Sequence, residues 1–169
     1  MNRQVEHREF EQMLRQSRRI IYRICLAFTD RKPDNVNDLY QDIACKLWLG
    51  WSKFRKESDV TSWVYRVALN TAVSEQRKWR NKDRPVFVAI DESLCDSLAE
   101  ESADQRLEHL YRLIDRLSKD EKKLIYLYFD RLPFAQIAVV AGISESAAKQ
   151  HIYRIKQKII KLHQKEMEN

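Results

Sequence analysis

Apolar residues recur at spacings of three and four along most of the chain, which predicts amphipathic helices in place of strands. Only two Gly and three Pro interrupt the 169 residues, so tight turns are few. The segments with this spacing cover about residues 10–28, 36–49, 61–80, 105–117, 119–129 and 134–162. The sequence therefore predicts an all-α fold.

The same spacing names the side chains that should be buried. The expected core positions are Phe10, Met13, Leu14, Ser17, Ile21, Ile24 and Phe28, then Val36, Leu39, Ile43 and Leu47, then Val64, Val67, Ala68, Thr71 and Ala72, then Leu107, Leu110, Leu113, Ile114 and Leu117, and last Ala148, Ile152, Ile155, Ile159 and Leu162. Ser118 and Glu121 are spaced as a capping box that opens the helix over 119–129.

Residues 134–160 are typical of a helix-turn-helix, in which the second helix enters the major groove of DNA. Ala138 is small where two helices cross, Gly142 allows a positive φ in the turn, and Ser144 can cap the second helix. Donors that can bond to base edges and phosphates lie opposite the expected core stripe of that helix: Ser146, Lys149, Gln150, Tyr153, Arg154 and Gln157. A solvated helical hairpin with a lysine-rich tail is the alternative interpretation of this segment.

Charge divides the chain into three parts. Residues 1–82 hold 17 Lys/Arg against 10 Asp/Glu, residues 83–104 hold 1 against 7, and residues 105–169 hold 13 against 8. Two basic blocks on either side of an acidic linker suit two contacts with one polyanion. We therefore expect an N-terminal domain over 1–82, a linker over 83–104 and a C-terminal domain over 105–169.

Other classes of function find little support in the sequence. Cys25, Cys45 and Cys95 are widely spaced, and neither a disulfide framework nor a zinc motif is indicated, so we expect core thiols and a linker thiol. The four histidines are scattered, and no nucleophile motif or glycine-rich phosphate loop is present. We expect a protein that is not an enzyme and has no cofactor or metal. No apolar run approaches the ~20 residues that span a bilayer, so a cytoplasmic protein is expected.

The N-terminal block carries the more specific signal. The string DLYQD begins at Asp38, Trp48 lies near the end of the same helix, and the run TSWVYRVALN begins at Thr61. Together with the C-terminal helix-turn-helix, this order and spacing closely resembles the extracytoplasmic function (ECF, group IV) RNA polymerase sigma factors. The resemblance covers about residues 8–82 and 105–163, and implies the family's region 2, an acidic linker and region 4.

The resemblance implies a role for each surface of the N-terminal block. The helix with Asp38, Leu39, Gln41 and Asp42 would dock on the clamp helices of the polymerase β′ subunit. The next helix and the loop before it would bind and melt the minus-10 element of the promoter. The residues implied for that contact are Phe54, Val60, Trp63, Arg66, Asn70 and Arg77. Taken alone, Asp38, Gln41 and Asp42 would be assigned to the solvent-exposed side of an amphipathic helix, which is where such residues usually lie. Trp63 taken alone is as suited to the core as to a base.

Region 4 would bind the minus-35 duplex through Ser146, Lys149, Gln150, Tyr153 and Arg154. The family pattern is kept in frame, with Gln136, Ala148 and Ile155 as departures that bear on base preference. Expected partners are core RNA polymerase, including its β subunit, and promoter DNA, with a membrane-bound anti-sigma factor left open. The alternative functions are a conventional helix-turn-helix regulator that acts without polymerase, and a structural adaptor that binds neither DNA nor polymerase.

Overall fold

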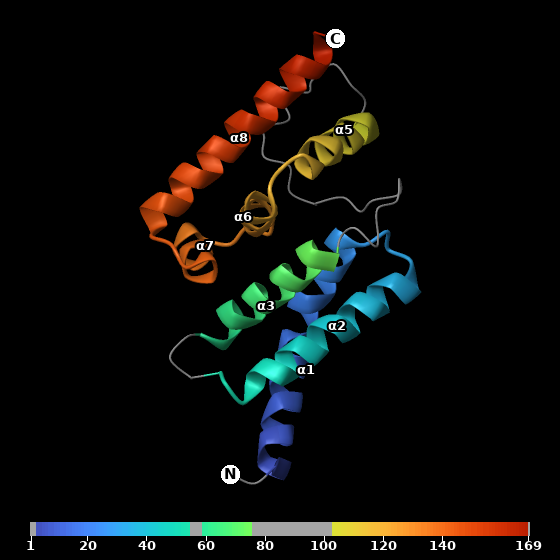
Figure 1. Ribbon diagram of the computed structural model, residues 1–169, viewed down its shortest axis with the longest axis vertical. Helices are drawn as coiled ribbons and strands as arrows, with labels where there is room; N and C mark the ends of the chain where they lie inside the picture. Colours follow the sequence, from blue (N-terminus) through green and yellow to red (C-terminus); the bar gives the residue numbers. More distant parts are fainter. Residues whose placement is uncertain (1–2, 55–58, 76–102, 169) are drawn as a thin grey trace. The chain divides into compact units, whose positions relative to one another are not determined.

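The computed structural model describes residues 3–54, 59–75 and 103–168, and these parts of the chain are almost entirely helical (Figure 1). The chain divides into two compact units, Met1–Pro85 and Val86–Asn169. The predicted all-α class is confirmed. The predicted limits of the linker, 83–104, stay a prediction, because residues 83–102 lie outside the described part.

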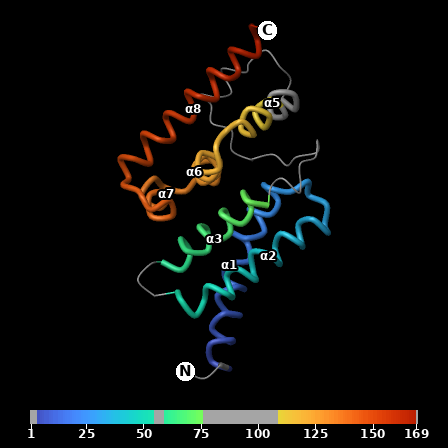
Figure 2. The backbone as a smooth tube through the Cα atoms, in the orientation of Figure 1, coloured from blue at the N-terminus to red at the C-terminus, as the bar shows by residue number. Residues whose placement is uncertain are grey.

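Unit 1 is a bundle of three helices, α1 (Arg3–Phe28), α2 (Pro33–Trp51) and α3 (Val60–Glu75), each packed against the other two. The chain reverses direction between α1 and α2 (Figure 2). Most of the expected core positions are buried, and Ile21, Ile24, Leu39, Ile43 and Leu47 have no exposed surface or almost none. Val67 and Leu14 are only half-buried, whereas the buried Tyr65 and Leu69 were not expected in the core.

Two helix limits differ from the prediction for identifiable reasons. α2 begins at Pro33 and not at Val36, because proline is suited to the first turn, where its missing N–H has no partner to lose. It also continues to Trp51, past Gly50, which the sequence placed in a loop. α3 is described to Glu75, so the predicted basic end of this helix at residues 76–80 lies outside the described residues.

The start of α2 is fixed by a buried carboxylate. Asp30 accepts hydrogen bonds from the Lys32 backbone N–H at 3.1 Å and from Asn35 Nδ2 at 2.7 Å, and Lys32 Nζ lies 3.5 Å from it. Burial alone would raise the pKa of Asp30, but these hydrogen bonds and the lysine charge outweigh it and lower the pKa. Asp30 therefore holds the connection between α1 and α2 in one conformation.

Unit 2 contains α5 (Ala103–Asp115), α6 (Lys119–Phe129), α7 (Phe134–Ala141) and α8 (Glu145–Met167). The long α8 packs against each of the other three helices. Its expected stripe is confirmed at Ala148, Ile152, Ile155 and Ile159, all buried, while Leu162 is half-buried beside them. The side chain of Leu107 lies outside the described part.

Candidate functional site

The exposed side of α2 forms a polar edge opposite the buried stripe of that helix. Asp38 and Gln41 are exposed and Asp42 is half-buried, so these three side chains are available to a partner. Leu39, which the resemblance placed in the same contact set, has no exposed surface. Its contribution is corrected accordingly: Leu39 packs in the bundle and sets the orientation of its polar neighbours.

Two further residues extend this edge and were missed by the sequence reasoning. Cys45 is exposed, and Leu49 is 74% exposed. From Asp42 onward they continue one helical face at spacings of three and four, a periodicity that could have identified them from sequence. The exposed Cys45 also corrects its expected role as a core thiol. Cys25 fits that role, since its burial raises the pKa of the thiol to about 12.

The outer face of α3 brings together the residues expected to meet an opened DNA strand. Arg66 and Asn70 are exposed and Trp63 is half-buried, one to two helical turns apart on one face. Val64, Ala68 and Ala72 are fully buried on the opposite side and fix this orientation. Arg77, expected in the same contact, lies outside the described residues.

A cluster of aromatic rings anchors Trp63 at the junction of α2 and α3. The ring of Phe54 stacks on Trp51 at a centroid distance of 5.9 Å and lies 4.8 Å from the ring of Trp63. The structure thus brings together Phe54 and Trp63, both predicted to bind the minus-10 element. Gly50 makes room for this packing, because a Cβ there would lie 3.1 Å from Cζ2 of Trp63.

The first turn of α3 is held by a polar cap. Asp59 Oδ2 accepts hydrogen bonds from the backbone N–H and the hydroxyl of Ser62, at 3.0 and 3.2 Å. Val60 begins the helix and is half-buried, so part of its side chain is accessible. The cap and the aromatic cluster therefore fix the N-terminal end of α3 and, with it, the exposed face that carries Trp63.

In unit 2 the turn between α7 and α8 has the geometry that the sequence predicted. Gly142 adopts φ +70°, in the left-handed region, and the Ile143 backbone N–H donates to Ala138 O at 3.0 Å. Ser144 Oγ accepts a hydrogen bond from the Ala147 backbone N–H at 3.1 Å and caps α8. The buried Ala138 lies at the crossing of the two helices.

The face of α8 opposite its buried stripe is exposed along the first three turns. The five residues predicted to bind the minus-35 duplex lie on it and are exposed: Ser146, Lys149, Gln150, Tyr153 and Arg154. Gln157, the sixth donor expected on this face, is half-buried. Tyr153 is 65% exposed, so its ring is accessible to a ligand. Lys149 Nζ lies 2.8 Å from Glu145 Oε1 and above the ring of Phe134, so it is held near the start of the helix.

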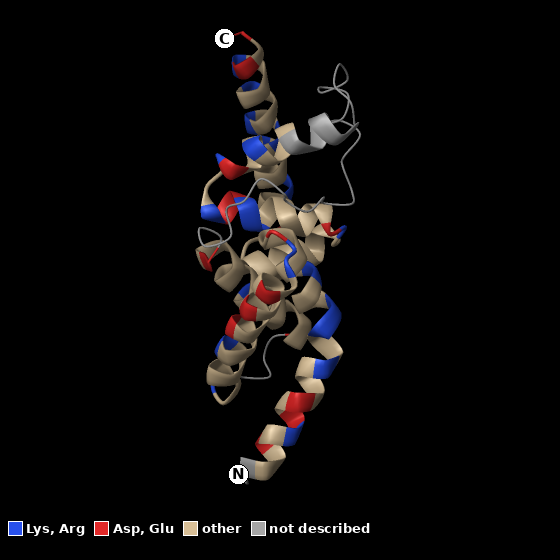
Figure 3. Cartoon of the chain, turned by 90° about the vertical axis from the view of Figure 1, so that its right-hand side faces the viewer, with Lys and Arg blue, Asp and Glu red and all other residues tan. Residues whose placement is uncertain are grey.

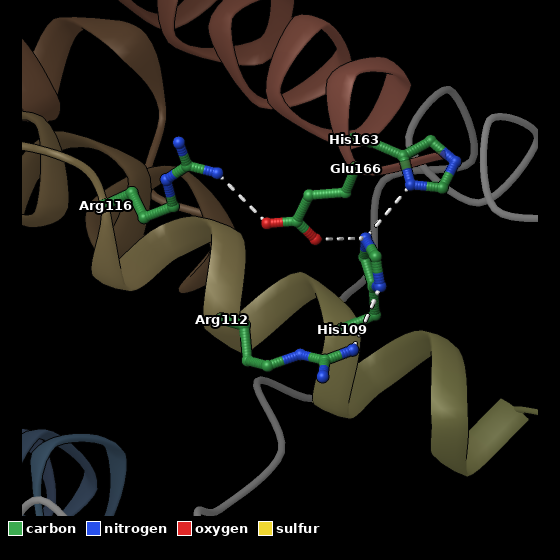
Figure 4. A network of polar contacts seen from close by, with 5 residues as sticks. All are labelled: His109, Arg112, Arg116, His163 and Glu166. Atoms are coloured by element: carbon green, nitrogen blue, oxygen red, sulfur yellow. Dashed lines mark hydrogen bonds and ion pairs between the residues drawn. The ribbon is translucent and has the colours of Figure 1, made fainter. Parts of the chain in front are cut away.

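A polar network ties the far end of α8 to α5 (Figure 4). Glu166 lies 3.0 Å from the Arg116 guanidinium and 3.5 Å from His109 Nε2, and His163 Nδ1 lies 3.0 Å from the same Nε2. Arg112 lies 3.2 Å from His109 Nδ1. Because arginine is always a donor, it places the proton of the neutral His109 ring on Nε2, facing His163.

This network corrects the expectation that the histidines are scattered, since the fold joins two of them across 54 positions of sequence. The network joins the C-terminal part of α8 to α5. Across the described ranges no group of His, Cys, Asp and Glu could hold a metal ion. Within the same ranges no helix is long and apolar enough to cross a membrane.

Comparison with known proteins shows the family. Residues 11–82 match the Sigma-70 region 2 family and residues 107–159 match the Sigma-70, region 4 family. The chain is 24% identical over 135 residues to the RNA polymerase sigma factor SigV of Bacillus subtilis (strain 168), covering 79% of this chain and 78% of that protein. It is 26% identical over 137 residues to the ECF RNA polymerase sigma-E factor of Escherichia coli (strain K12), covering 74% and 72%.

Two solved structures share the fold. CnrH, in complex with the cytosolic domain of CnrY, superposes with a TM-score of 0.60 at 18% identity, covering 94% of this chain and 89% of that chain. The sigma factor RpoE of Bartonella quintana, in complex with the anti-sigma factor NepR, gives a TM-score of 0.55 at 20% identity, covering 92% and 97%. With both sigma regions matched in order, the chain belongs to the sigma-70 family and is an RNA polymerase sigma factor of the ECF group.

Proposed function

We propose that this sigma factor divides promoter recognition between its two units. The α2 edge of Asp38, Gln41 and Asp42 docks on the β′ clamp helices of core polymerase. The α3 face of Trp63, Arg66 and Asn70, with Phe54 and Val60 beside it, binds the opened minus-10 strand. The α8 face of Ser146, Lys149, Gln150, Tyr153 and Arg154 binds the minus-35 duplex. Arg77 is retained in the minus-10 set on the resemblance alone.

One observation carries this assignment: each polar face lies opposite a buried stripe on its own helix. The buried stripes of α2, α3 and α8 orient the opposite faces of these helices toward solvent, which supports the three proposed contacts. An exposed face of base-reading donors on a capped recognition helix suits a major groove. A half-buried tryptophan beside an exposed arginine and an exposed amide suits unstacked bases.

The domain limits of 1–82, 83–104 and 105–169 are part of the proposal, with the two sigma regions on either side of an acidic linker. The protein itself has no catalytic role in this scheme and confers promoter specificity on the polymerase, a role that belongs to the cytoplasm. An anti-sigma factor is proposed as a further partner, because the structurally similar RpoE was solved in complex with the anti-sigma factor NepR. The β subunit is proposed as a second contact on polymerase.

Reconstituted transcription tests the function directly. Core polymerase is incubated on a genomic fragment library with and without the protein, and start sites are mapped. Initiation that depends on the protein supports the proposal. Binding to duplex fragments in the absence of polymerase, without any new start site, supports instead a conventional helix-turn-helix regulator.

A further inference from the structure

The exposed side of α1 forms a third charged surface on unit 1, which we name the α1 arginine face: Arg15, Arg18, Arg19, Tyr22 and Arg23. From residue 12 to residue 29 the chain contains no Asp or Glu and no Lys, so every charge in this stretch is an arginine. All five side chains are exposed. We propose that this face binds the phosphate backbone of a nucleic acid strand, with Tyr22 stacking on a base.

Helix geometry makes these residues one surface. Met13, Ser17, Ile21 and Ile24 are buried, and they lie on the opposite side of α1, against α2 and α3. Arg15, Arg18, Arg19 and Tyr22 therefore point away from the bundle, whereas Arg23 lies at the edge of the face and reaches α3. Arg15, Arg19 and Arg23 recur every four residues, a spacing of about 6 Å along the helix axis. Figure 3 shows acidic and basic residues mixed in the first turns of α1, and only basic residues further along.

An exposed aromatic ring among the arginines favours a nucleic acid strand over an acidic protein partner, since guanidinium groups bind carboxylates as well as phosphates. Guanidinium groups bind phosphate oxygens through two parallel hydrogen bonds and stack on planar groups, which lysine does not do. The other basic surface, on α8, is built mainly from lysine. Tyr22 is 47% exposed among the arginines, and an exposed ring between cations is the arrangement that holds single-stranded nucleic acid.

One of the arginines is oriented by a tyrosine of a neighbouring helix. Arg23 donates a hydrogen bond to the Tyr65 hydroxyl of α3 at 3.2 Å. Arg15 lies 3.6 Å from Glu11 and donates to the Glu11 carbonyl, but its side chain is 78% exposed. An exposed ion pair of this kind contributes little and gives way readily to a phosphate.

This face is separate from the α2 edge and the α3 face, so its function does not depend on the proposed polymerase contact.

Binding of the full-length protein to a fluorescent single-stranded oligonucleotide of mixed sequence is measured from about 50 to 200 mM salt. The plot of log K against log salt has a negative slope, and the variant Arg15→Gln with Arg19→Gln is expected to make it less steep by about 1.4. Each phosphate of a single strand that is no longer neutralised reduces the steepness by ~0.7. The control Lys46→Gln with Lys119→Gln removes the same charge from α2 and α6. Equal slopes in the two pairs overturn the proposal.

Substitutions of Tyr22 test stacking separately from charge, because they leave the net charge unchanged. Tyr22→Phe is expected to bind like the parent protein, because stacking needs the ring and not the hydroxyl, whereas Tyr22→Ala weakens binding about fivefold or more. Equal affinity of the two variants excludes stacking.

A photoreactive phenylalanine at position 22, introduced into holoenzyme on promoter DNA, is expected to cross-link to DNA. Cross-links only to a polymerase subunit, or none, overturn the proposal. The oligonucleotide measurement still stands if holoenzyme fails to form, so failure of this proposal and failure of the proposed function give different results.

Discussion

Glu121 on α6 and Lys158 on α8 are joined by two short contacts, with Nζ lying 2.8 Å from Oε2 and 3.0 Å from Oε1. The same carboxylate accepts a hydrogen bond from the Ser118 backbone N–H at 2.8 Å, and Ser118 Oγ in turn accepts from the Glu121 backbone N–H. The capping box that the sequence predicted is thus also a tie between two helices. It holds α6 against the middle of α8, whose exposed face is proposed to bind the minus-35 duplex.

The stability of unit 2 should depend on pH through this carboxylate. Burial alone would raise the pKa of Glu121, but the hydrogen bonds from Lys158 and Ser118 outweigh it and lower the pKa below its ordinary value. A lowered pKa means that the stabilisation is complete above about pH 5 and is lost as pH falls through the native pKa. Glu121→Gln keeps a capping acceptor but loses the charge, and is expected to cost about 0.5–1 kcal/mol near pH 7.

Urea unfolding of parent and Glu121→Gln proteins between about pH 3 and pH 7 checks this prediction. The difference in free energy of unfolding should shrink as pH falls. All four tryptophans precede residue 80, so tryptophan fluorescence reports unit 1 and far-UV circular dichroism reports both units. The substitution should leave the fluorescence transition in place. A difference that is independent of pH would rule out the carboxylate as its source.

The spacing of apolar residues and the capping residues were enough to predict the helices of both units. Burial of one apolar stripe also determines which side of each helix faces the core. The stripe Val36, Leu39, Ile43 and Leu47 and the helix Lys119–Phe129 are as predicted. Contacts between helices could not be predicted in this way. The pairing of His109 with His163 and the packing of Trp63 over Gly50 depend on how helices cross, and no local pattern records that.

The candidate site shows the same division. The α8 face could be predicted from the spacing of its buried residues, and its five predicted residues are all exposed. The inclusion of Leu39 in a contact set came from a motif string and not from its place in the period, which assigns it to the core. The exposed Cys45 and Leu49 continue the helical spacing of the α2 edge but belong to no motif, so a motif alone does not identify them.

Charge reversal on the α2 edge should weaken binding to core polymerase. Asp38→Lys with Asp42→Lys replaces two carboxylates by cations on a surface that the fold leaves accessible. Removal of a complementary charge pair at an interface, followed by like-charge contact, costs several kcal/mol. We expect at least a tenfold loss of affinity, measured by fluorescence anisotropy with labelled protein and core polymerase.

A matched control for this variant is Glu6→Lys with Glu9→Lys, which makes the same change of net charge at the start of α1. It should bind core polymerase much more tightly than the α2 variant. Both should keep the helical circular dichroism of the parent. Equal losses in the two variants would mean that net charge, and not the α2 edge, governs docking.

Substitutions on α8 should separate base contacts from phosphate contacts. One good bidentate base contact contributes about 1–3 kcal/mol of discrimination, so Lys149→Ala with Arg154→Ala should weaken protection of the upstream promoter element by up to that amount for each base that either side chain binds. A uniform loss across sequences would assign the pair to phosphates. Footprints of holoenzyme on wild-type and mutated minus-35 elements measure both effects, and an unchanged footprint would contradict the assignment.

Glu145 offers a contrasting variant on the same turn of α8. Its carboxylate lies 2.8 Å from Lys149 Nζ and adds a negative charge beside the expected phosphates. Glu145→Gln frees the lysine and removes the repulsion, so binding of the upstream element should become tighter by a few tenths of a kcal/mol. A variant that gains affinity cannot be explained by damage to the fold.

Opening of the promoter separates a sigma factor from any regulator that binds duplex DNA alone. Asn70 is exposed on the same α3 face as Arg66 and Trp63, and Trp63 is held by its contact with Phe54. Expelling a base from the stack costs a few kcal/mol, and an exposed amide can offset part of this cost by bonding to the base edge. Asn70→Ala should therefore lower open-complex formation, measured by permanganate reactivity of minus-10 thymines, far more than it lowers core binding.

A template already unpaired at the minus-10 element tells melting apart from binding of the melted strand. On that template the cost of unstacking is already met, so Asn70→Ala should recover part of the lost activity. Ser74→Ala, an exposed neighbour one turn further along α3, serves as the matched control and should open the duplex promoter normally. A residue that captures bases must matter most on the duplex template, where the bases have first to be exposed. Normal permanganate reactivity with Asn70→Ala, or equal defects on the duplex and the unpaired template, would therefore show that this face does not bind the opened strand.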